Sequence, residues 1–259
     1  MKTSAFTLLL LFLAAGCLPT DTLPTPNVGN DERDYYIECY CVPGEPFRLT
    51  ATRSLPLDET LTPDLDLPLD ATIVAGDTIN LRFDIFPGSG RLPYNYGSHR
   101  TMRTDVDSIF LRVSTPDRRE ITARDIVPAP VAIDSVRRDN NLVTIRFRVS
   151  GNPSSNYYIY ILQPLRGNET LDAVSTLLDY SASVPRSVVE RSLSLPEEAT
   201  GARVILRGVS RACYSYQISL NEANSAQQGS IISPAPLAGN IEGANGIFTC
   251  YTEDERVVE

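Results

Sequence analysis

Residues 143–149 read Val-Thr-Ile-Arg-Phe-Arg-Val, with an apolar side chain at every second position. Successive side chains of a β-strand point to opposite faces of its sheet, so this alternation predicts a strand with one buried face. The same pattern recurs at residues 79–85 and 109–113. Turn-forming clusters separate such runs, at residues 43–45, 87–90, 139–141 and 151–153. The chain is therefore expected to be mainly β, with the strand spacing of a sandwich.

A proline-rich segment divides the chain into two parts. Pro128-Ala129-Pro130 lies between two groups of strands, and proline cannot donate a ladder hydrogen bond. We expect a boundary there, between an N-terminal β-sandwich at residues 35–130 and a C-terminal β domain at residues 131–259.

One helix is expected at about residues 210–226, where a four-three spacing forms an apolar face: Val209, Cys213, Tyr216, Leu220 and Ala223. The expected fold is thus two Ig-like, sandwich-type β parts with one helix packed on a sheet in the C-terminal half.

The N-terminus has the features of a lipoprotein signal. An apolar run at residues 5–13 leads into Leu13-Ala14-Ala15-Gly16-Cys17, which has the form of a bacterial lipobox. A membrane-spanning anchor fits less well, because the run is about half the roughly 20 residues that cross a bilayer. A simple secretory signal would end in an Ala-x-Ala pattern. We expect a signal peptide at residues 1–16, acyl chains on Cys17 and a flexible tether at residues 17–34. This predicts a lipid anchor in the outer membrane, on its periplasmic or its cell-surface face.

Composition excludes several kinds of site. The formal net charge is −9, which argues against nucleic acid as a partner. His99 is the only histidine, so a site that needs two imidazoles is excluded. The cysteines lack the paired spacing and the nearby histidine of a zinc site. We therefore predict no metal, no cofactor and no enzymatic activity; a hydrolase that uses His99 is an alternative.

Four cysteines follow the expected anchor: Cys39, Cys41, Cys213 and Cys250. An even number suits disulfide bonds in an oxidising compartment. Cys39 and Cys41 lie two residues apart on an expected strand, so they point to one face and each could meet another partner more easily than its neighbour. We predict at least one disulfide that joins the first or the final strand to another element. The alternative is four buried thiols that act as small apolar residues.

Residues 87–105 are basic and aromatic in an otherwise acidic chain. Arginine and tyrosine are enriched at binding hot spots, and a loop of this length is uncommon unless it is functional or mobile. We expect a loop that contacts a ligand or partner through Arg91, Tyr94, Tyr96, His99, Arg100 and Arg103. The alternative is a solvated loop whose arginines pair with acids elsewhere.

Glycines punctuate the segment before an expected final strand at residues 247–251. Gly239, Gly243 and Gly246 are expected to supply positive φ angles or close backbone approach in a tight loop that re-enters the sheet. A phosphate-binding loop is rejected, because these glycines do not lie between a strand and a helix N-terminus.

Several segments together resemble one known family. They are residues 43–49 (PGEPFRL), Asn156-Tyr157-Tyr158, the helix around Tyr214 and Tyr216, and the ending at residues 236–248. In this order they resemble the Bacteroidota lipoprotein family known as domain of unknown function 4249, whose ending usually has a Gly-Gly pair where this chain has Gly243-Ala244. Its members are often encoded beside TonB-dependent receptors, which implies an accessory binding protein in nutrient uptake, with an unknown ligand. A structural or adhesive surface lipoprotein is the second hypothesis, and the hydrolase is the third.

Overall fold

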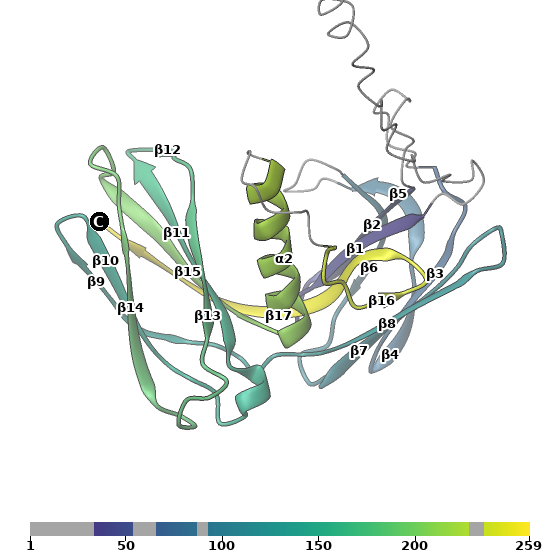
Figure 1. Ribbon diagram of the computed structural model, residues 1–259, viewed down its shortest axis with the longest axis horizontal. Helices are drawn as coiled ribbons and strands as arrows, with labels where there is room; N and C mark the ends of the chain where they lie inside the picture. The colour runs from purple at the N-terminus through teal and green to yellow at the C-terminus, as the bar shows by residue number, and fades with distance from the viewer. Residues whose placement is uncertain (1–33, 54–65, 87–92, 228–235) are drawn as a thin grey trace, which may run out of the picture. The chain divides into compact units, whose positions relative to one another are not determined.

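A computed structural model describes residues 34–53, 66–86, 93–227 and 236–259, so Cys17 and Arg91 lie outside the described residues (Figure 1). It confirms a mainly β fold, and its one described α-helix, α2 (Arg211–Gln227), lies in the C-terminal half. A short 3-10 helix, η1, spans Pro153–Ser155. The strands are β1 (Tyr35–Cys41), β2 (Pro46–Arg53), β3 (Asp70–Ala75), β4 (Asp77–Asn80), β5 (Arg82–Phe86), β6 (Tyr94–Thr101), β7 (Ser108–Ser114), β8 (Glu120–Ile126), β9 (Ile133–Asp139), β10 (Leu142–Arg148), β11 (Tyr157–Arg166), β12 (Glu169–Thr170), β13 (Val174–Asp179), β14 (Val188–Ser194), β15 (Gly201–Val209), β16 (Ile241–Glu242) and β17 (Asn245–Val258).

Three sheets make up the described part of the fold. The largest has nine strands in the order β12-β11-β15-β17-β1-β2-β6-β5, with β13 also paired to β11. A five-stranded sheet has the order β16-β8-β7-β3-β4, and a three-stranded sheet has the order β14-β10-β9. Each smaller sheet packs against one half of the largest sheet, because only one face of each alternating strand is apolar.

Two hydrophobic cores result from this packing. The N-terminal core joins the large sheet to the five-stranded sheet through side chains such as Ile37 and Ile109. The C-terminal core joins β10 to β11 and β15 through side chains such as Ile145, Tyr160 and Leu206. All five of these side chains are completely buried.

Strand β17 belongs to both halves, as its yellow ribbon shows in Figure 1. Its residues 245–250 pair in parallel with β1, and its residues 251–258 pair antiparallel with β15. Phe248 lies in the N-terminal core, whereas Val258 packs against the C-terminal core. The expected boundary at residues 128–130 lies between the two cores along the chain, but the final strand crosses from one to the other. Residues Asp34–Glu259 accordingly form one unit.

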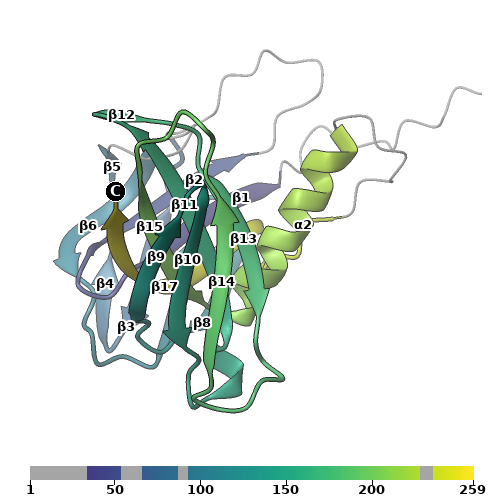
Figure 2. The same cartoon turned by 90° about the vertical axis from the view of Figure 1, so that its left-hand side faces the viewer.

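The helix expected at about residues 210–226 is confirmed as α2. Ser210 precedes it, and the Ser210 Oγ accepts a hydrogen bond from the Cys213 backbone N–H at 3.1 Å, which is the contact of an N-cap. Cys213 and Tyr216 are buried, and α2 packs against β17 and β11. In the view of Figure 2, α2 lies to the right of β13. No helix in the described ranges is long and apolar enough to cross a membrane.

The ending before β17 has the backbone that its glycines predict. Gly243 has a φ of 84° and Gly246 a φ of 113°. A Cβ at Gly246 would lie 1.9 Å from the carbonyl oxygen of Ile37, so a residue without a side chain is required where β17 meets β1. Ala244, the expected departure from a Gly-Gly pair, has no positive φ and packs against the N-terminal core.

Candidate ligand-binding site

A pocket of about 710 Å³ lies on one face of the nine-stranded sheet, beside α2. We call it the tyrosine pocket, because four tyrosines line it together with one carboxylate, one guanidinium, one amide and several small or aliphatic side chains. These residues are Tyr36, Glu38, Tyr40, Thr50, Tyr94, Ile159, Ile161, Ala173, Ser175, Arg207, Val209, Cys213, Gln217 and Tyr251. Three of them alternate along β1 and three others come from β15 and β17, so the pocket depends on how β17 joins the two halves.

Hydrogen bonds order the tyrosine hydroxyls near Glu38. The Tyr36 and Tyr216 hydroxyl oxygens are 2.8 Å apart, and Tyr36 also donates a long hydrogen bond of 3.5 Å to Glu38 Oε2. Gln217 Nε2 donates to the Tyr40 hydroxyl at 3.4 Å. Burial, followed by Tyr216 and Glu38, raises the pKa of Tyr36, and burial and Glu38 raise the pKa of Tyr40. Both phenols therefore stay protonated at neutral pH and can donate hydrogen bonds.

The two charged groups of the tyrosine pocket have different surroundings. Arg207 Nε lies 2.8 Å from Glu253 Oε2, and the guanidinium carbon lies 4.6 Å from the centre of the Tyr251 ring. Glu38 is half-buried and forms no ion pair with any described residue. As far as the described residues go, the pocket therefore contains a compensated cation and a carboxylate without a counter-ion.

A buried polar junction lies behind the helix wall of the pocket. Asp125 Oδ2 accepts hydrogen bonds from Ser210 Oγ and Thr249 Oγ1, each at 2.6 Å, and Oδ1 accepts one from the Ile126 N–H at 2.9 Å. Burial raises the pKa of this carboxyl. Burial, with Asp125 nearby, also raises the pKa of Cys213 to about 12, so the thiol that lines the pocket is protonated and a poor nucleophile. The junction ties the start of α2 to β8 and β17 and so positions the pocket wall.

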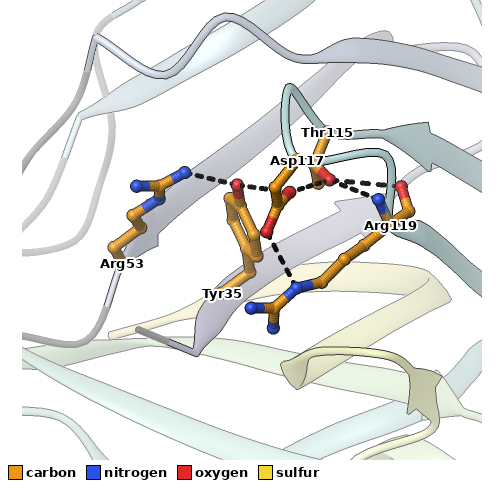
Figure 3. A network of polar contacts seen from close by, with 5 residues as sticks. All are labelled: Tyr35, Arg53, Thr115, Asp117 and Arg119. Carbon is orange, nitrogen blue, oxygen red and sulfur yellow. Dashed lines mark hydrogen bonds and ion pairs between the residues drawn. The ribbon is translucent and has the colours of Figure 1, made fainter. Parts of the chain in front are cut away.

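A second polar cluster lies at the start of β1 (Figure 3). Arg53 Nη2 donates to the Tyr35 hydroxyl at 2.6 Å, and this hydroxyl donates to Asp117 Oδ1 at 3.3 Å. Asp117 also pairs with Arg119 Nε at 2.8 Å and accepts a hydrogen bond from Thr115 Oγ1. The Thr115 hydroxyl, together with Arg119, lowers the pKa of Asp117. The acid is satisfied within the cluster, which therefore fixes β1 and offers little to a ligand.

The expectation of a loop at residues 87–105 is wrong for residues 94–101, which form β6 between β2 and β5. Tyr96 is only 2% exposed, and its hydroxyl accepts a hydrogen bond from the Leu69 N–H at 2.9 Å and donates one to the Leu67 carbonyl. Tyr96 is therefore a core residue. Tyr94, in contrast, lines the tyrosine pocket.

The two described arginines of this segment are exposed and paired. Arg100 Nη2 lies 3.3 Å from Asp77 Oδ2, and Arg103 Nη2 lies 2.5 Å from Asp105 Oδ2. Such pairs match the alternative of solvated arginines that contact acids. A role for these arginines in binding stays a prediction, and so does that of Arg91.

The single histidine is also exposed. The His99 ring meets the Phe86 ring edge-to-face, with 6.2 Å between their centres. No described residue forms a hydrogen bond to the imidazole, so no acid within the described ranges orients it as a catalytic base would require.

The four cysteines are buried free thiols. The Sγ atoms of Cys39 and Cys41 are 3.7 Å apart, and Cys41 lies opposite Cys250 in the parallel register. Cys213 belongs to a different apolar cluster. The Cys39 thiol and burial raise the pKa of Cys41, and burial raises that of Cys250. A disulfide stays a prediction, for which the register makes Cys41 and Cys250 the nearest pair on different elements.

Sequence reasoning missed the residues of β1 that line the tyrosine pocket. The signal was present at residues 35–41 (YYIECYC), where Tyr36, Glu38 and Tyr40 alternate with buried residues. The alternation marks a polar face on a strand, but the helix that turns this face into a pocket comes from the other end of the chain.

Comparison with known proteins identifies the family. No curated protein matches the chain. A family model described as "Domain of unknown function (DUF4249)" matches residues 24–257, which confirms the resemblance seen in the sequence. The chain belongs to this family.

Proposed function

We propose that this protein is an outer-membrane lipoprotein that binds a ligand and serves a TonB-dependent receptor in nutrient uptake. The tyrosine pocket is the observation that carries the proposal. Its volume of about 710 Å³ falls within the range of roughly 300–1,000 Å³ that is typical of ligand sites. Aromatic rings and a few polar groups line it, as they line such sites. Its walls are hydrogen-bonded strands and α2, so a ligand would find the site already formed.

The sequence supports the location and the partner. The lipobox supports an anchor on Cys17, and two or three acyl chains hold a protein durably on a membrane. Residues 18–34 could reach about 55 Å when extended, which would let the folded part contact a neighbouring membrane protein. Members of the family that the sequence resembles are often encoded beside TonB-dependent receptors, which supports such a receptor as the neighbouring membrane protein.

Isolation of the acylated protein from its own outer membrane in mild detergent tests this proposal. We expect mass spectrometry to find a TonB-dependent receptor in the isolated complex. The Cys17→Ser variant is the matched control, because it keeps every described contact and removes only the attachment point of the lipid. We expect it to leave the outer-membrane fraction and to recover less receptor.

Two outcomes would contradict separate parts of the proposal. If wild-type protein brings no TonB-dependent receptor, the proposed partner is wrong. If the Cys17→Ser protein is still processed and still fractionates with the outer membrane, the lipid anchor is wrong. Protease treatment of intact cells then shows which face of the membrane carries the protein.

A further inference from the structure

We infer that the tyrosine pocket takes a ligand that carries an organic cation, an ammonium or guanidinium group, with Glu38 as its counter-ion. This inference rests on the proposed function, because it assigns a chemical class to the ligand of the same pocket.

Glu38 provides the first argument. Its side chain is half-buried, its hydrogen bond from Tyr36 is long at 3.5 Å, and no described cation pairs with it. A carboxylate offers about four acceptor positions, and removing it from water without a cation is costly. A cation in the pocket would offset this cost and form short, charge-assisted hydrogen bonds with the carboxylate.

The tyrosine rings provide the second argument. Tyr36 and Tyr40 lie two residues to either side of Glu38, so all three point to the same face of β1. The faces of aromatic rings attract cations. The protein already stacks the guanidinium of Arg207 on Tyr251, with 4.6 Å between the guanidinium carbon and the ring centre. The Tyr251 ring of this pocket therefore already contacts a guanidinium, which is one of the two inferred ligand groups.

The balance of charge provides the third argument. Arg207 is the one basic residue among the described residues that line the pocket, and Glu253 compensates it at 2.8 Å. The charges of Arg207 and Glu253 cancel, so Glu38 leaves one negative charge in excess among the described groups at the pocket. An anionic ligand would need a free cation, which the described lining does not supply. The formal net charge of −9 also favours the approach of a cation.

Binding of two matched peptides tests the inference. The probes are acetyl-glycyl-arginyl-glycinamide and the same peptide with citrulline, which has nearly the same shape without the charge. We propose to measure both by saturation-transfer NMR on the acylated full-length protein in deuterated detergent at low salt. We expect the arginine peptide to bind about tenfold more tightly, since a desolvated cation–π contact and an ion pair act together.

Three variants locate the binding. Glu38→Gln keeps the size of the side chain and removes its charge, so the preference for arginine should disappear. Ser175→Trp places a large ring at an exposed rim position of the tyrosine pocket and should block both peptides. Ser135→Trp makes the same change at an exposed position of β9, outside the pocket, and should alter nothing. Thermal melts of all three variants check that the fold is retained.

The outcomes separate this inference from the proposed function. Equal binding of the two peptides to wild-type protein, or a preference that survives Glu38→Gln, overturns the inference. If binding is equal and Ser175→Trp abolishes it, the pocket is still a ligand site and the proposed function stands. If neither peptide binds, the inference is also overturned, and recovery of the receptor then decides the proposed function independently.

Discussion

Replacement of Gly246 by alanine should separate β17 from β1 within the N-terminal half of the fold. The new Cβ would lie 1.9 Å from the carbonyl oxygen of Ile37, whereas carbon–oxygen contacts between strands are about 3.3 Å or longer. The strands would have to move apart by more than about 1 Å, which breaks neighbouring ladder bonds. Two lost hydrogen bonds cost about 1–3 kcal/mol, and the positive φ of 113° adds about 1–2 kcal/mol for a residue with a side chain.

Gly44 offers a matched control for this change. Its φ is 89°, but a Cβ there would meet no atom within 4 Å. Gly44→Ala should therefore lower the free energy of unfolding by the backbone term alone, about 1–2 kcal/mol, and Gly246→Ala by about 2–5 kcal/mol. Urea unfolding followed by far-UV circular dichroism measures both. Gly246→Ala should also weaken binding of the arginine peptide, because β1 and β17 both line the tyrosine pocket. Equal destabilisation by the two variants, within about 0.5 kcal/mol, would refute the close-approach argument.

The buried Asp125 should make stability depend on pH. Burial raises the pKa of Asp125 in the folded state. The stability that this carboxyl contributes through its raised pKa is therefore complete below the ordinary aspartate pKa and is lost as the pH rises through the raised pKa. The difference in unfolding free energy between wild type and Asp125→Asn should therefore fall as the pH rises above about 4, and a constant or rising difference would contradict this. Non-reducing peptide mapping of protein taken directly from the envelope should find Cys41 joined to Cys250, and four free thiols would instead support the apolar-thiol alternative. The double change Arg100→Ala with Arg103→Ala should leave stability almost unchanged, since exposed ion pairs contribute little, and should reduce recovery of the receptor. Equal recovery would exclude this surface as the contact.

Local pattern was sufficient to predict individual elements. The alternation at residues 143–149 matches β10, and the four-three spacing matches α2, because each depends on side chains that are near in sequence. The parallel pairing of β1 with β17 joins the two ends of the folded chain, and no local pattern specifies such a partner. The prolines at residues 128–130 predict where the chain passes from the N-terminal core to the C-terminal core. They do not predict that β17, at the end of the chain, pairs with strands of both halves.

Strand β6 was missed because its polar residues look solvated. Asn95 is buried, and its side chain accepts a hydrogen bond from the Ala51 N–H at 2.8 Å and donates one to the Ala51 carbonyl at 2.7 Å. The amide thus takes the place of a backbone partner within the sheet. Tyr96 likewise uses its hydroxyl to hold the Leu67–Leu69 backbone. Residue types typical of binding loops therefore serve packing here, and their partners are distant in sequence.

The strand that follows the expected tether is also the strand that lines the tyrosine pocket. Tyr35 begins β1 and is held by Arg53 and Asp117, so a pull on the tether would meet this cluster before it reached Glu38 (Figure 3). The parallel ladder with β17 holds the same strand from Tyr36 to Cys41. A lipid on Cys17, as proposed, would therefore load β1 at Tyr35, where the side-chain cluster holds the strand, and a tether of residues 18–34 could extend to about 55 Å between the bilayer and the start of β1.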